Sequence, residues 1–184
     1  VNATIKANDY VGGIAGANED SQISNCKVSG VVNGHSRVGG IAGYTVRSDH
    51  STASIYKCEN NATITGSGDS GEMVGGIAGE NGNSKIEKCH NTGQINGNSN
   101  FMGGVTGNNS SASRIDQCYN TGNIMPTGIS TTVGGLTGWN VGSVIIDSYN
   151  KGNISASVFI LAAGGIAGKD IQGTITNCYN TGSI

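Results

Sequence analysis

Two short phrases alternate along this whole chain, and they constrain its fold more than any other feature. The first phrase reads VGGIAG at residues 11–16 and returns at intervals of 27, 36, 28, 31 and 30 residues. Its later copies read VGGIAG at 38–43 and 74–79, MGGVTG at 102–107, VGGLTG at 133–138 and AGGIAG at 163–168. Self-similarity at a period of roughly 20–50 residues is the signature of a repeat architecture.

A second phrase follows each copy of the first and begins with Ile. Its copies read ISNCKVSGVV from Ile23, IYKCENNATI from Ile55, IEKCHNTGQI from Ile86, IDQCYNTGNI from Ile115, IIDSYNKGNI from Ile145 and ITNCYNTGSI from Ile175. The opening residues 2–5 match residues 61–64, so we expect the array to continue upstream. We therefore interpret residues 1–184 as a single repeat domain, a fragment of a longer array.

The residue types in these phrases favour short strands over helices. Paired Gly inside a helix costs about 1 kcal/mol per residue relative to Ala, and every first phrase contains such a pair. Short β-prone segments bounded by Gly or Asn are typical of strands. The sequence therefore predicts an all-β fold, a right-handed parallel β-solenoid (β-helix) of about six coils of roughly 30 residues.

In-register stacking of the coils predicts three apolar ladders around a narrow core. We expect Asn before the turns to bond both backbone and the next Asn, and Gly to allow sharp turns or positive φ. Insertions at 45–54 and 66–72 are expected in outer loops. The first ladder is Ile14, Ile41, Ile77, Val105, Leu136 and Ile166. The second is Ile23, Ile55, Ile86, Ile115, Ile145 and Ile175, and the third is Ile64, Ile95, Ile124, Ile154 and Ile184. The Asn set is Asn60, Asn91, Asn120, Asn150 and Asn180.

Composition argues for a folded chain without a nucleic-acid or membrane function. Gly contributes 32 of 184 residues, but β-branched residues recur regularly and the net charge is only -2, so disorder is not expected. Lys and Arg are scattered, which gives no basic footprint for nucleic acid. No apolar run approaches the roughly 20 residues of a membrane-spanning helix.

The five cysteines occupy one place in the repeat, and Ser148 fills that place in the fifth unit. Spacings near 30 residues match no zinc motif, and an odd count leaves at least one thiol free. We expect a ladder of small buried thiols that serves packing. The residues are Cys26, Cys58, Cys89, Cys118 and Cys178.

Residues that suggest catalysis or metal binding are isolated from one another. Residues 68–71 read GDSG, as around the nucleophile of trypsin-like proteases, but those enzymes also need a positioned His and Asp. His35, His50 and His90 fall in different parts of different units, and the acidic pairs do not match calcium loops. We therefore expect no enzyme activity, no metal and no cofactor.

Tyr119, Tyr149 and Tyr179 are the candidate binding residues, because they recur at one place in the last three complete phrases. Stacked one coil apart, they form either an aromatic strip for sugars or another protein, or a cover over the edge of the core. Trp139 and Tyr44 share a place after the first phrase. The other units have Ala17, Glu80, Asn108 and Lys169 there, so no continuous platform is expected.

The paired phrases resemble the GLUG motif, a family named for a Gly-Leu-x-Gly core. That core appears at residues 135–138 as GLTG, and elsewhere as GGIAG, and CYNTG-x-I at 118–124 and 178–184 is similar to the family's continuation. The family occurs in large secreted or surface-anchored bacterial proteins, including IgA-specific metallopeptidases and adhesins. The resemblance implies an extracellular, non-catalytic region, and the zinc motif of the metallopeptidases is absent from this sequence.

Two functions and a third alternative follow from this pattern. The first is a structural or adhesive module, either a stalk or a surface that contacts host protein or glycan. The second is an accessory domain that positions substrate for a secreted protease or glycosidase. The third is a self-assembling filament subunit, since the coil edges at both ends lack partners.

Overall fold

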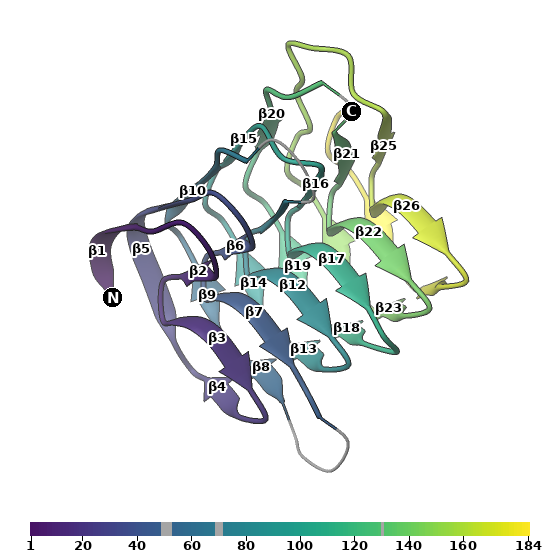
Figure 1. Ribbon diagram of the computed structural model, residues 1–184. Coiled ribbons are helices and arrows are strands. Elements are labelled where there is room, and N and C mark those ends of the chain that lie inside the picture. The colour runs from purple at the N-terminus through teal and green to yellow at the C-terminus, as the bar shows by residue number, and fades with distance from the viewer. Residues whose placement is uncertain (49–52, 69–71, 130) are drawn as a thin grey trace.

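The repeats form a stack of parallel coils in which each side of the coil builds its own sheet. A computed structural model describes residues 1–48, 53–68, 72–129 and 131–184. Every strand pair in these residues is parallel, and none of these residues is helical. The prediction of an all-β parallel solenoid is confirmed, and Figure 1 shows the coils succeeding one another from the N-terminus to the C-terminus. The right-handed coil stays a prediction.

Three sheets contain one strand from each of six coils. Sheet 1, from the first two residues of each first phrase, is β2 (Val11–Gly12), β6 (Val38–Gly39), β11 (Met73–Gly75), β16 (Phe101–Gly103), β21 (Thr132–Gly134) and β25 (Ala162–Gly164). Sheet 2 is β3 (Ala15–Glu19), β7 (Ala42–Val46), β12 (Ala78–Gly82), β17 (Thr106–Ser110), β22 (Thr137–Val141) and β26 (Ala167–Ile171). Sheet 3 is β4 (Gln22–Ser24), β8 (Ser54–Tyr56), β13 (Lys85–Glu87), β18 (Arg114–Asp116), β23 (Val144–Ile146) and β27 (Thr174–Thr176).

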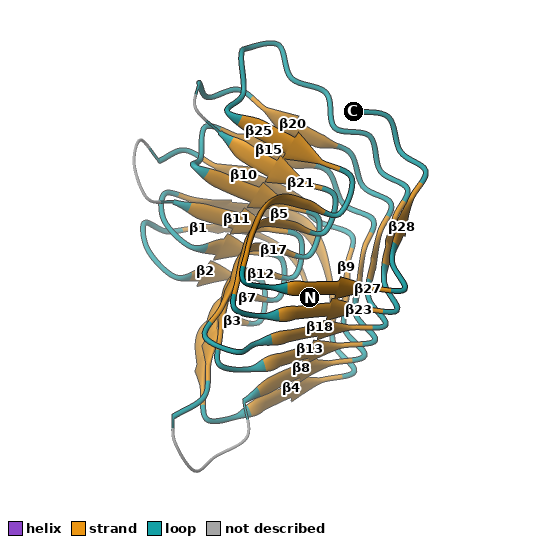
Figure 2. Cartoon of the chain, turned by 90° about the vertical axis from the view of Figure 1, so that its right-hand side faces the viewer, coloured by secondary structure: helices purple, strands orange, loops and turns teal. Residues whose placement is uncertain are grey.

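Sheet 4 has ten strands because the long strand β5 (Lys27–Gly34) pairs along two columns. One column is β9 (Glu59–Asn60), β14 (His90–Asn91), β19 (Tyr119–Asn120), β24 (Tyr149–Asn150) and β28 (Tyr179–Asn180). The other is β1 (Asn2–Lys6), β10 (Thr63–Gly66), β15 (Ile95–Gly97) and β20 (Ile124–Pro126). Figure 2 shows the parallel layers of the stack from the side of sheet 3.

The three predicted apolar ladders are confirmed in the interior of the stack. Ile86 is in register with Ile55 on one side and Ile115 on the other, and all three are fully buried. In the third ladder Ile64, Ile95 and Ile124 pair in register and Ile154 bridges to Ile124. The outermost members are less covered, because each has a neighbouring coil on one side only. Their exposures are 37% for Ile14, 39% for Ile175 and 63% for Ile184.

The predicted Asn ladder is confirmed with its full hydrogen-bonding. Each amide nitrogen donates to the amide oxygen of the next Asn along the stack, over 2.7 Å from Asn60 to Asn91 and 2.8 Å from Asn120 to Asn150. The same amide spans the following turn, as where the Asn120 nitrogen donates to the Gly122 carbonyl and its oxygen accepts from the Gly122 N–H. These buried polar groups are therefore satisfied within the stack.

The glycines of the first phrase permit close approach, and the expectation of positive φ is wrong for them. A Cβ on Gly104 would lie 2.2 Å from the Gly135 carbonyl oxygen and 2.4 Å from the Asn120 side chain. Positive φ instead falls on the residue before each Cys or its Ser counterpart, which is never Gly. These residues are Asn25, Lys57, Lys88, Gln117, Asp147 and Asn177, with φ between 48° and 54°.

The two insertions are shorter than predicted, because Thr45 and Val46 belong to β7, Ser54 to β8 and Gly66 to β10. The other described residues of 45–54 and 66–72 lie between strands, and residues 49–52 and 69–71 fall outside the described residues. Among the residues that the structure describes, no helix is long and apolar enough to cross a membrane.

Candidate functional site

The three candidate tyrosines form one continuous stack on the outer side of sheet 4. Each precedes an Asn of the ladder, and alternation along the strand turns the ring outward when the Asn turns inward. The centroids of Tyr119 and Tyr149 lie 5.0 Å apart with their planes 2° apart, and Tyr149 and Tyr179 lie 5.0 Å and 9° apart. In-register pairing of β19, β24 and β28 therefore brings together the three tyrosines that occupy one position of the repeat.

The stack continues toward the N-terminus into charged residues. The ring of His90 lies 4.6 Å from that of Tyr119 with the planes 6° apart. The His90 Nε2 is 3.6 Å from a Glu59 oxygen, and the other Glu59 oxygen pairs with the Lys27 ammonium at 2.9 Å. We call these six residues the aromatic column: Lys27, Glu59, His90, Tyr119, Tyr149 and Tyr179.

The geometry of the aromatic column limits what it can contact. Because the rings are parallel and follow one another along the stack, both faces of Tyr149 are covered by its neighbours. A sugar that packs its C–H groups on an aromatic face finds no free face there. The column instead presents ring edges and hydroxyl groups, a combination of apolar body and polar tip that is frequent at protein interfaces.

Partial burial and a neighbouring cation influence the ionisation and the surroundings of the tyrosine rings. Burial, together with Tyr149 and Glu59 nearby, raises the pKa of Tyr119, so this phenol stays protonated at neutral pH. The Lys151 ammonium lies 5.1 Å from the centroid of the Tyr149 ring. Tyr179, in the outermost coil, is 49% exposed, whereas Tyr119 and Tyr149 are half-buried. The column therefore also covers the strands beneath it.

Tyr44 and Trp139 do not form a platform, as expected, because their own column contains Glu80, Asn108 and Lys169. The two rings pair sideways with sheet 1 instead. Tyr44 lies 5.9 Å from Tyr10, and Trp139 stacks on Phe101 at 4.7 Å. These pairs join the outer sides of sheets 1 and 2, which the spacing within one phrase did not reveal.

The cysteine column is buried at Cys58, Cys89 and Cys118 and partly exposed at Cys26 and Cys178. It also has a hydrogen-bonding role that the sequence interpretation missed. The Cys58 N–H donates to the Cys89 sulfur at 3.3 Å, and the Cys118 N–H donates to the Ser148 hydroxyl oxygen at 3.0 Å. The presence of Ser148 at the Cys position of the fifth unit could have indicated this role, because the Ser hydroxyl and the Cys thiol can both accept a hydrogen bond. All five thiols are free, and burial raises the pKa of the Cys89 thiol.

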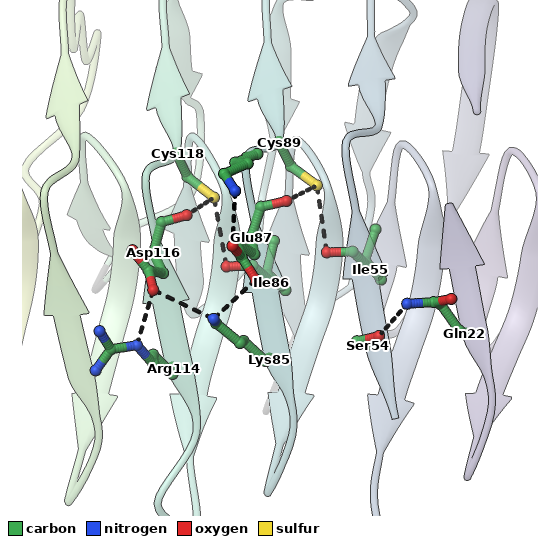
Figure 3. Close-up of polar contacts among 11 residues, drawn as sticks. Gln22, Ser54, Ile55, Lys85, Ile86, Glu87, Cys89, Arg114, Asp116 and Cys118 are labelled. Carbon is green, nitrogen blue, oxygen red and sulfur yellow. Dashed lines mark hydrogen bonds and ion pairs between the residues drawn. The ribbon is translucent and has the colours of Figure 1, made fainter. Parts of the chain in front are cut away.

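A group of ion pairs lies on the outer side of sheet 3, and the pair between Lys85 and Asp116 joins two successive coils, as Figure 3 shows. The Lys85 ammonium lies 2.8 Å from a Glu87 oxygen and 3.3 Å from an Asp116 oxygen. Arg114 donates to the same Asp116 oxygen at 3.0 Å. Burial disfavours the charged Asp116, but the hydrogen bonds from Arg114 and Lys85 outweigh it and hold the pKa of this carboxyl below its usual value. The Lys85 hydrogen bond likewise lowers the pKa of Glu87.

The remaining candidates are dispersed. His35 lies at an exposed turn after β5, far in the repeat from His90, and His50 and Ser70 fall outside the described residues. Within the described residues, no three His, Cys, Asp or Glu side chains gather as a metal site. The second insertion places a Glu72 carboxylate oxygen among buried side-chain atoms, next to Gly68.

A search among curated proteins and a search among solved structures found no match to this chain. Two segments, residues 7–33 and 70–96, match the family model described as the GLUG motif. Each segment runs from just before a first phrase to the end of the following second phrase, which is one coil of the stack. The chain therefore contains two copies of the GLUG motif.

Proposed function

We propose that this domain is an extracellular, non-catalytic module of a bacterial surface or secreted protein, which serves as a structural stalk and as an adhesive surface. The observation that supports this proposal most strongly is the in-register pairing of four parallel sheets through successive coils. Stability in such a stack comes from nearest-neighbour contacts, so coils add length without needing a central core. A GLUG repeat domain also fits a repeat module of a larger protein.

The adhesive surface that we propose is the aromatic column, with a protein as its partner. Its parallel rings leave edges and hydroxyls for contact, and aromatic side chains with polar tips are enriched where proteins bind one another. Lys27 and Glu59 at the other end of the column pair with each other, and the Lys27 side chain is largely exposed. We therefore expect binding energy to concentrate on Tyr119, Tyr149 and Tyr179.

The test uses the purified domain and immobilised extracellular-matrix proteins, namely collagen, fibronectin and mucin. We expect saturable binding to at least one, and at least a tenfold loss of affinity in Tyr149→Ser with unchanged circular dichroism. Lys27→Gln, in the same column, is the matched control and should bind as the unaltered domain does. Absence of binding to all three proteins, or equal binding by Tyr149→Ser, would contradict the adhesive role.

The extracellular location and the non-catalytic role have separate tests, the first on cells of the source organism. An antibody raised against the domain should label intact cells or the culture medium, and brief protease treatment of intact cells should remove the cell-bound label. Labelling that requires permeabilised cells would refute the extracellular location. Hydrolysis of casein by the domain that is lost in His90→Gln would refute the non-catalytic role.

A further inference from the structure

A depression of about 500 Å³ lies beside sheet 3, where the insertion after β7 meets the first four coils. Its floor includes outward side chains of β4, β8, β13 and β18, among them Gln22, Ser54 and Lys85. Small-molecule sites in proteins have volumes of roughly 300–1,000 Å³, so this space suits a ligand of one or two rings. We call it the basic pocket.

Two sets of hydrogen bonds fix residues 47 and 48, the described start of the insertion after β7, from which Arg47 lines the pocket. On one side, the Asp20 carboxylate accepts from the Ser48 N–H at 2.6 Å and from its hydroxyl at 2.5 Å. On the other side, Arg47 Nη2 donates to the Asn83 Oδ1 at 3.1 Å, and Asn83 Nδ2 donates back to the Arg47 carbonyl at 3.0 Å. Residues 47 and 48 are thus held to the preceding coil and to the following one.

The pocket is positively charged although the chain carries a net charge of -2. Three cationic side chains line it, Arg47, Lys85 and Arg114, against one carboxylate, Glu87. Asp116, behind the rim, binds both Lys85 and Arg114 and holds their charged ends over sheet 3 (Figure 3). The Arg47 guanidinium bonds a neutral amide, so its charge is not cancelled by that contact.

The other lining groups select among anions. Sulfate offers acceptors alone, so it has no hydroxyl to donate to Glu87, whose lowered pKa keeps it ionised. A ligand with a carboxylate and several hydroxyls satisfies every part of the lining. Its carboxylate pairs with Arg or Lys, and its hydroxyls donate to Glu87 and exchange hydrogen bonds with the amides and hydroxyl of the floor.

An aromatic ring with two lysine ammonium groups over it lies at the edge of the pocket. Tyr56 lines the pocket, and its in-register neighbours are Ser24 and Glu87. Unlike Tyr149, it is therefore not placed between two parallel aromatic rings. The Lys57 and Lys88 ammonium groups lie 5.1 Å and 5.5 Å from its centroid, which adds positive charge to the same rim.

We propose that the basic pocket binds an acidic sugar, with the carboxylate held by Arg47 and Arg114 and the ring hydroxyls held by Glu87, Asn83 and Gln22. This site is separate from the aromatic column, and it does not depend on the adhesive role of the tyrosines. It would add a glycan specificity to a module whose repeated surfaces carry none.

The test is a titration of the ¹⁵N-labelled domain with glucuronate, galacturonate and N-acetylneuraminate, with glucose as the neutral probe. We expect at least one acidic sugar to shift the amide resonances of Ser54, Lys85 and Arg114, with an affinity at least tenfold higher than that of glucose. Arg47→Gln and Arg114→Gln should each raise the Kd about tenfold or more, as for the loss of a charged hydrogen bond. Lys151→Gln, a charge removal beside the aromatic column, should leave the Kd unchanged.

Three results would overturn the proposal. The first is the absence of shifts with all three acidic sugars up to 20 mM, on the order of the weakest specific affinity that would matter here. The second is equal binding of glucose. The third is unchanged affinity in both Arg variants while their spectra show the native fold. The Tyr149→Ser variant separates the two sites, because it should keep the acidic sugar and lose the protein partner.

Discussion

Removing one amide from the middle of the Asn ladder should destabilise the stack more than any surface change of equal size. Asn120 is fully buried and takes part in four hydrogen bonds: one from Asn91, one to Asn150, and two with the backbone of Gly122. A buried hydrogen bond contributes a net stabilisation of about 0.5–1.5 kcal/mol, and its loss leaves the former donor or acceptor buried without a partner. We therefore expect Asn120→Ala to lower the free energy of unfolding by about 3–5 kcal/mol.

The assay is urea unfolding followed by far-UV circular dichroism and by the fluorescence of Trp139, the single Trp of the chain. Asn96→Ala is the matched control, because the Asn96 side chain lies on the outer side of β15 and accepts one exposed hydrogen bond from Gln94. The control should change the unfolding free energy by about 0.5 kcal/mol or less. Equal midpoints for the two variants would refute the stabilising role of the ladder.

Three further changes probe the core, the cysteine column and the ion pairs. Ile86→Asp should place an unpaired charge between Ile55 and Ile115 and unfold the adjacent coils, so an unchanged melting temperature would contradict the ladder assignment. Cys89→Ser should be about 1 kcal/mol less destabilising than Cys89→Ala in chemical denaturation, because only Ser keeps an acceptor for the Cys58 N–H. Glu87 and Asp116 have lowered pKa values, so their stabilisation is complete above the usual carboxyl pKa near 4 and is lost as the pH falls below it. The melting temperature should accordingly fall between pH 6 and pH 3, and it should fall less in the doubly neutral variant Glu87→Gln with Asp116→Asn.

The interior of the fold was predictable because it depends on equivalent residues meeting one another. Once the two phrases are aligned, Ile86 must face Ile115 and Asn91 must face Asn120, and the structure has both pairs. A second polar ladder, in which Asn81, Asn109 and Asn140 bond in turn at 2.7 and 2.8 Å, had the same signal and was missed. Its members follow the first phrase by two residues in each unit.

Features that join different positions of the repeat were not predictable in this way. The basic pocket is lined by side chains from four coils, including Arg47 and Ala53 at the described ends of an insertion present in one coil. Arg47 and Asn83 share the place four residues after the first phrase, but the residue type there differs from unit to unit, so no repeated side chain marked it. The positive φ of the residue before each Cys could not be predicted from the residue type either. Types as different as Lys88 and Asp147 adopt the same φ because the coil on either side imposes the turn.

The parallel faces of the tyrosines were likewise out of reach of the sequence. Repetition placed Tyr119 and Tyr149 one coil apart, but only the ring orientations show that the faces are covered and the edges are free. This detail shifts the expected partner of the column from a stacked sugar to a protein.

In-register contact between successive coils is the central claim, and methyl nuclear Overhauser spectroscopy of an Ile-labelled sample tests it most directly. With neighbouring strands about 4.8 Å apart, cross-peaks should connect the methyls of Ile86 with those of Ile115, and those of Ile115 with those of Ile145. The pair Ile86 and Ile145, two coils apart, should give a much weaker cross-peak or none. Absence of the Ile86–Ile115 cross-peak in a folded sample would contradict the stack and every site built on it.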